Sequence, residues 1–84
     1  TAALILSKTI ALGKEMAKTQ KDAATVIAAM KANIETEPLA KIDYVEAVDA
    51  FSMQPIDTFD RPAMIAMAVY IGKTRLIDNT LIED

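Results

Sequence analysis

The part of the sequence that decides the fold is MIAMAVYI, residues 64–71, followed by Gly72-Lys73 and then by TRLIDNTLI, residues 74–82. The first run is continuously apolar, which is typical of a strand that is buried on both faces or central in its sheet. Gly72-Lys73 breaks the pattern, and the second run has the character of another strand. Because the connection is so short, the two strands are expected to pair antiparallel.

Another strand is predicted at about residues 42–49, where IDYVEAVD is rich in β-branched and aromatic residues and partly alternates. Residues 54–57 and 60–62 contain Pro and Asp, and they are predicted to be loops. The predicted strands, at about 42–49, 63–71 and 74–82, therefore form a small antiparallel sheet of about three strands.

Residues before Pro38 have helical spacing, and they predict helices at about 2–18 and 22–36. Gly13 lies inside the first helix, where it costs about 1 kcal/mol relative to Ala, and a close approach to a neighbouring element would explain it. Asp22 is expected to cap the second helix, with its carboxylate accepting from a free backbone N–H. Pro38 ends that helix, because the residue before a proline avoids the helical region.

The short polar connection at residues 19–22 predicts an αα-hairpin. The predicted fold class is therefore α+β, with an N-terminal αα-hairpin packed on one face of the small antiparallel sheet. At 84 residues and 9.1 kDa, the chain is predicted to be a single domain, residues 1–84.

Composition excludes several kinds of chemistry. The chain has no Cys and no His, which removes disulfides, the usual zinc ligands and histidine-based triads. The net charge of −3 and the pI near 4.8 speak against a nucleic-acid partner, which usually requires a basic patch.

No membrane partner is predicted either. The longest uncharged run, residues 62–72, has eleven residues, whereas a membrane-spanning helix needs roughly 20. No basic segment followed by an apolar run marks a signal peptide. The chain starts at Thr1 rather than Met, which indicates a fragment or a processed product.

Gly72-Lys73-Thr74 looks like the end of a phosphate-binding loop. That motif requires a glycine where this chain has Met67, and a helix must follow it. Here a strand is predicted to follow, so a turn between strands is the better interpretation.

Other polar residues lack the spacing that chemistry needs. Asp43 and Asp49 lie about 20 Å apart in a strand, with Glu46 on the opposite face, which indicates a solvated surface. Arg75 and Asp78 also lie on opposite faces and are not expected to pair. Ser7 and Ser52 have no histidine base to activate them. Asp57 and Asp60 lack the spacing of a calcium-binding loop. The five methionines, at positions 16, 30, 53, 64 and 67, are either core residues or a soft binding surface.

Two stretches are more specific: IDYVEAVD, residues 42–49, and AMAVYIGKTRLIDN, residues 66–79. Both resemble the C-terminal domain of the pantothenate synthetase family, also called pantoate–β-alanine ligases. MQPID, residues 53–57, resembles that family's linker between strands, and Ala3-Leu4 with Leu6-Ser7-Lys8 resembles its first C-terminal helix. The RLIDN ending, residues 75–79, is the most specific part of a resemblance that covers nearly the whole chain.

The resemblance implies the lid of a two-domain, cytoplasmic enzyme. Such an enzyme joins pantoate to β-alanine with ATP and Mg through a pantoyl-adenylate intermediate. It pairs the lid with a Rossmann-like N-terminal domain, and the parent is expected to be a homodimer. The family's His-x-Gly-His signature and its Ser-Ser-Arg-Asn stretch have no counterpart here. The fragment is therefore expected to be inactive alone, with no catalytic, cofactor-binding or metal-binding residue.

Two questions stay open at this stage. Lys73 or Arg75, near a strand turn, is a candidate to reach bound nucleotide when the lid closes, and the alternative for each is a solvent-facing or scaffold cation. The rival interpretation of the whole chain is a stand-alone α+β protein-interaction module that acts through a strand edge or a Met-rich face.

Overall fold

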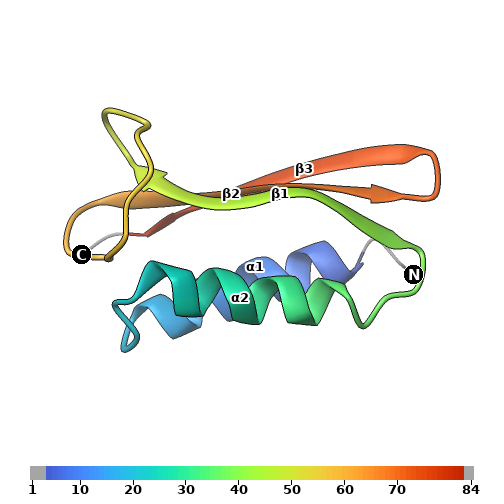
Figure 1. Cartoon of the computed structure of the whole chain (residues 1–84), viewed down its shortest axis with the longest axis horizontal. Coiled ribbons are helices and arrows are strands. Elements are labelled where there is room, and N and C mark those ends of the chain that lie inside the picture. The colour runs from blue at the N-terminus through green and yellow to red at the C-terminus, as the bar shows by residue number, and fades with distance from the viewer. Residues whose placement is uncertain (1–3, 83–84) are drawn as a thin grey trace.

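The computed structural model describes residues 4–82, and it contains two helices followed by three strands. The helices are α1 (Leu4–Ala17) and α2 (Ala23–Ile34). The strands β1 (Ala40–Asp49), β2 (Ala63–Ile71) and β3 (Thr74–Ile82) form one antiparallel sheet in the order β1-β2-β3. Figure 1 shows both helices under one face of the sheet, with no helix over the other face. The predicted α+β fold class is therefore confirmed.

The two helices pack closely at Gly13, which is buried. A Cβ atom built on Gly13 would lie only 2.5 Å from Met30 Sδ, so the close approach that the sequence suggested is real. Nearby, Asn33 Nδ2 donates a 2.8 Å hydrogen bond to the hydroxyl of the fully buried Thr9. Thr9 is the only buried polar residue of the described core, and this hydrogen bond supplies the partner that a buried hydroxyl requires.

Capping of α2 differs from the expectation. Asp22 is the N-cap residue, but its side chain makes no capping hydrogen bond to the backbone. Its carboxylate accepts from the Thr25 hydroxyl instead, while the Ala23 N–H donates to the Asp57 carbonyl at 2.9 Å. A distant segment of the chain thus satisfies a free N–H that the sequence assigned to a local cap.

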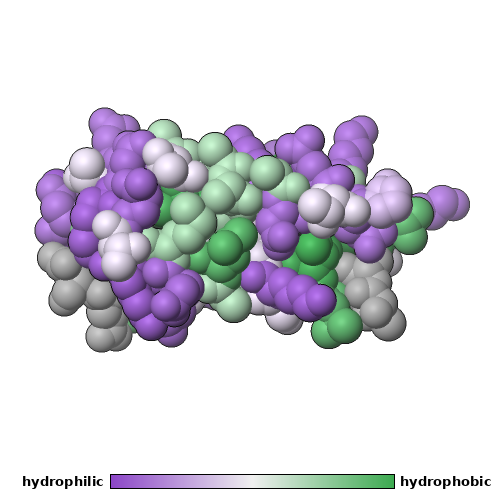
Figure 2. All heavy atoms as spheres, turned by 90° about the horizontal axis from the view of Figure 1, so that it is seen from below, coloured by the Kyte–Doolittle hydropathy of each residue, from purple (hydrophilic) through white to green (hydrophobic). Residues whose placement is uncertain are grey.

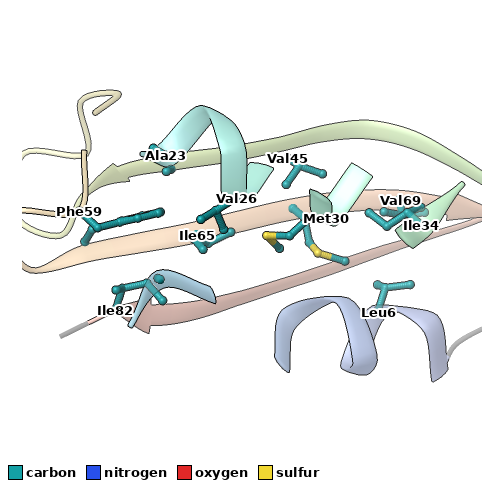
Figure 3. Packing of buried hydrophobic residues seen from close by; sticks show 14 residues of the cluster. Leu6, Ala23, Val26, Met30, Ile34, Val45, Phe59, Ile65, Val69 and Ile82 are labelled. Atoms are coloured by element: carbon teal, nitrogen blue, oxygen red, sulfur yellow. The ribbon is translucent and has the colours of Figure 1, made fainter. Parts of the chain in front are cut away.

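Strand β2 lies at the centre of the sheet, as its apolar run predicted. Ile65, Met67 and Val69 are fully buried and belong to the hydrophobic core that the helices cover. Figure 3 shows Val26 and Ile34 of α2 lying against this strand. The pairing of β1 with β2 is irregular between Ile42 and Tyr44, which is a β-bulge.

The connection between β1 and β2 does more than predicted for a loop. The Asp49 N–H donates to the Gln54 carbonyl at 2.8 Å, and the Ile56 N–H donates to the Ala47 carbonyl at 3.1 Å, so this segment pairs along the outer edge of β1. Phe59 then enters the core with 1% of its surface exposed, and Figure 3 shows it at one end of the cluster. No periodic pattern in the surrounding sequence marks Phe59 as a core residue.

Candidate functional face

The candidate functional site is the face of the sheet that turns away from the helices. Side chains alternate between the two faces of a strand, so the residues between the core positions of each strand lie on this second face. We call it the open face. It consists of Lys41, Tyr44, Glu46, Val48, Met64, Ala66, Ala68, Tyr70, Arg75, Ile77, Asn79 and Leu81.

Apolar side chains dominate the centre and the β3 side of the open face. Ile77 is 59% exposed, Leu81 47% and Tyr70 37%. Figure 2 shows the opposite side of the molecule, where the helices present hydrophilic residues at both ends and both weakly and strongly hydrophobic residues between them. Of the seven large apolar residues that are exposed in the described chain, five lie on the open face or in the loop beside it, and the other two are Leu4 of α1 and Leu39 between α2 and β1.

That loop, residues 50–53, follows β1 and rises from the sheet on the side away from the helices (Figure 1). The Asp49 carboxylate holds it by accepting from the backbone N–H groups of Phe51 and Ser52 at 2.8 and 2.9 Å. The hydrogen bonds from Ser52 and Phe51 lower the pKa of Asp49, and the Arg61 guanidinium, 3.8 Å away, adds to the effect. Met53 adopts a φ of 62°, which is uncommon for any residue other than glycine.

Polar side chains gather at the other end of the open face. Arg75 donates from Nε at 3.1 Å and from Nη2 at 2.9 Å to a single oxygen of Asp43. This hydrogen bond to Asp43 raises the pKa of Arg75. A shallow hollow of about 460 Å³ lies beside the pair, lined by Lys41, Ile42, Asp43, Tyr70 and Gly72.

The two cations singled out in the sequence therefore differ. Arg75 is engaged by the Asp43 carboxylate across the open face. Lys73 lies in the two-residue connection between β2 and β3 and is exposed. Of the two, Lys73 has the side chain that is better placed to reach a charged group on another surface.

The remaining sequence candidates are dispersed over the fold. Arg75 and Asp78 lie on opposite faces of β3, as expected, and so do Glu46 and Asp49 on β1. Met30 and Met67 are core residues, whereas Met53 is 54% exposed in the loop. Phe51, which is 85% exposed, and the role of Asp49 in the loop were missed. An Asp at the end of a predicted strand, whose side chain can accept from the backbone two residues on, is the turn signal that could have found that role.

Two further classes of site have no counterpart among residues 4–82. The described residues contain no group of three or more Asp, Glu, His or Cys side chains that could hold a metal ion. Within the same range, no helix is long and apolar enough to cross a membrane.

Two helices under one face of a three-stranded sheet, with the second face partly apolar and uncovered, define a small α+β domain of the helix-on-sheet kind. The model of the pantoate–β-alanine ligase family matches residues 1–81. The chain belongs to this family.

Similar proteins carry the name pantothenate synthetase. The protein of Ruminiclostridium cellulolyticum is 57% identical over 79 residues, which are 93% of this chain and 28% of that protein. The protein of Enterococcus faecalis is 44% identical over 84 residues, covering 99% of this chain and 30% of the relative. The crystal structure of pantothenate synthetase from Thermus thermophilus shares the fold, with a TM-score of 0.84 at 21% identity over 95% of this chain and 29% of that one. The chain thus spans less than a third of the length of these relatives.

Proposed function

We propose that residues 1–84 form the C-terminal lid domain of a pantothenate synthetase. The full-length enzyme would condense pantoate with β-alanine, using ATP and Mg, through a pantoyl-adenylate intermediate. The observation that carries the proposal is the family match over residues 1–81, together with 57% identity to a relative of which this chain covers 28%. The N-terminal Rossmann-like domain of the same polypeptide would be its partner, in a cytoplasmic homodimer.

In this proposal the chain contributes closure rather than reacting groups. An acyl adenylate is open to attack by water, and a lid that excludes water protects it and strengthens the electrostatic interactions around it. The open face offers apolar side chains such as Ile77 and Leu81 for this purpose. The catalytic and metal-binding residues, and the principal nucleotide-binding residues, would come from the rest of the enzyme.

The experiment is to clone the complete gene and assay pantothenate, AMP and pyrophosphate formation from pantoate, β-alanine and ATP. The full-length protein is expected to form the three products in equal amounts, and the 84-residue chain alone none. A full-length protein that forms no pantothenate would overturn the proposal.

A truncated enzyme that lacks the 84-residue segment tests the lid itself. If the lid protects the adenylate, the truncated enzyme should release AMP and pyrophosphate in excess of pantothenate, because water then competes with β-alanine. Equal product ratios in a truncated enzyme that still turns over would contradict a protective lid.

Lys73 is the cation of this chain that we propose for contact with bound nucleotide in the closed enzyme, since Asp43 already engages Arg75. Lys73→Ala in the full-length enzyme should raise the KM for ATP, with little change in the stability of the domain. An unchanged KM and an unchanged kcat would leave Lys73 as a solvent-facing cation.

A further inference from the structure

We propose that the open face and the loop at residues 50–53 together form the surface that docks against the N-terminal domain of the same polypeptide. This inference rests on the proposed function and specifies which side of the lid faces its partner. The helical face would remain in solvent.

The first argument is the uneven distribution of apolar surface. Monomeric proteins rarely leave large contiguous apolar patches in water, and such patches commonly mark interaction sites. Ile77 and Leu81 of β3 are both about half exposed on the open face. The other face of β3 packs on α1 and the core. A sheet with helices on one side and exposed Ile and Leu on the other lacks a second covering layer.

The second argument is the loop, which presents its apolar side chains on a fixed backbone. Phe51 is 85% exposed, yet its own N–H and that of Ser52 are held by Asp49. The Met53 N–H donates to the Asp49 carbonyl at 2.9 Å, and φ is 62° at Met53. Unfavourable backbone conformations that neighbouring contacts maintain cluster at functional sites. A preorganised loop loses less conformational entropy on binding, and exposed aromatic side chains are frequent anchors of interfaces.

The third argument identifies the partner. This chain covers only 28% and 30% of the two relatives described above, so most of such a polypeptide lies outside it. A tethered domain is present at an effective concentration in the millimolar range. A free second copy of the chain would have to associate from a far more dilute solution, and a copy held in the proposed homodimer would meet the open face only where the subunit interface placed it there. The tethered domain is therefore the occupant that the open face is expected to meet first.

Cysteine labelling of the full-length protein tests the proposal, because this chain has no cysteine of its own. Phe51→Cys and Ile77→Cys probe the loop and the open face. Leu39→Cys is the matched control, since Leu39 is 62% exposed, close to the 59% of Ile77, but lies in the connection from α2 to β1. The rate of maleimide modification at each position is measured by peptide mass spectrometry over a range of protein concentrations, and pantothenate formation is measured on the same samples.

If the open face docks, the thiols at positions 51 and 77 should react at least about tenfold more slowly than the thiol at position 39. This slowing is expected when the docked state is populated about tenfold more than the undocked state. It should be the same at every protein concentration. Equal rates at the three positions in an enzyme that forms pantothenate would overturn the docking inference and leave the proposed function intact. Protection that disappears on dilution would identify a second copy as the occupant and would also overturn it.

Discussion

At the scale of single residues, three side chains show how far local sequence predicts local role. Gly13 was singled out because glycine weakens a helix interior, and its contact with Met30 explains it. Asp22 was expected to cap α2 with its side chain, and this was wrong. The Ala23 N–H donates instead to the Asp57 carbonyl, 34 positions after Ala23 in the chain. The role of Asp49 in fixing residues 51 and 52 was missed, although the hydrogen bonds are local.

Gly13→Ala is expected to lower the free energy of unfolding by up to about 2 kcal/mol, because overpacking a core costs about 1–3 kcal/mol and the gain in helix propensity offsets about 1. The added methyl group would lie 2.5 Å from the sulfur of Met30, which is fully buried, so the end of the Met30 side chain would have to shift within the core. Urea denaturation measures the change.

The matched background for this test is Met30→Ala, which removes the obstructing sulfur. In that background, Gly13→Ala should be neutral or stabilising by up to about 1 kcal/mol. The same penalty in both backgrounds would show that Met30 is not its cause.

Asp49 makes the stability of the fold sensitive to acid. Hydrogen bonds from Ser52 and Phe51 lower the pKa of Asp49 in the folded chain, so the unfolded chain takes up a proton first as the pH falls. The stabilising contribution is therefore present above about pH 4, the ordinary range of an Asp carboxyl, and is lost as the pH falls through the lowered pKa.

The Asp49→Asn variant is expected to show a shallower loss of stability between about pH 4 and pH 2 than the unaltered chain, since its amide does not ionise. Denaturation midpoints across this range measure the slope. Identical slopes for the two proteins would contradict the assignment of this acid sensitivity to Asp49.

At the scale of elements, the three strands and the pairing of β2 with β3 followed from pattern, whereas the irregular parts did not. The limits of β2 and β3 agree with the predicted 63–71 and 74–82. The apolar run, the Gly72-Lys73 turn and the second strand-like run are all visible in the local sequence. β1 starts two residues earlier than predicted, at Ala40. Its bulge between Ile42 and Tyr44 leaves no sign in the sequence, because it depends on how β1 registers with β2.

The turn between β2 and β3 depends on Gly72, which has a φ of 61° and no atom within 4 Å of the place where a Cβ would stand. Gly72→Ala is therefore expected to destabilise the fold through backbone strain alone, by about 1–2 kcal/mol. Lys73→Ala, in the same turn but without a positive φ, should change stability by less than about 0.5 kcal/mol. Thermal denaturation of the two variants compares them, and similar losses would exclude backbone conformation as the reason for the glycine.

At the scale of the whole molecule, the open face is the feature that connects fold and function. Its large exposed apolar residues come from β2 and β3, and the loop that rises beside it follows β1 (Figure 1). No single stretch of sequence contains this surface. The family resemblance suggested a lid, and the arrangement of layers indicates which side of the lid is available to close.

Ile77→Asp in the full-length enzyme is expected to weaken closure, because docking would then bury a carboxylate that has no partner. We expect more AMP released per pantothenate formed, with little change in the melting temperature, since Ile77 is already 59% exposed in the domain. Leu39→Asp is the control at a similarly exposed position, and it should leave the ratio of AMP to pantothenate unchanged. If both variants change the ratio equally, the effect does not belong to the open face.

The sequence by itself determined the α+β class, the antiparallel hairpin of β2 and β3 and the family of the chain, and it left β2 either buried on both faces or central in the sheet. These features depend on periodicity, on turn residues and on motifs that are contiguous in the chain. Only the tertiary structure decided that Phe59 fills the core, that the Asp57 carbonyl accepts from the first N–H of α2, that Asp43 engages Arg75, and that Ile77 and Leu81 share an uncovered face. Each of these depends on which distant segments meet, and that follows from strand register and helix packing rather than from neighbouring residues.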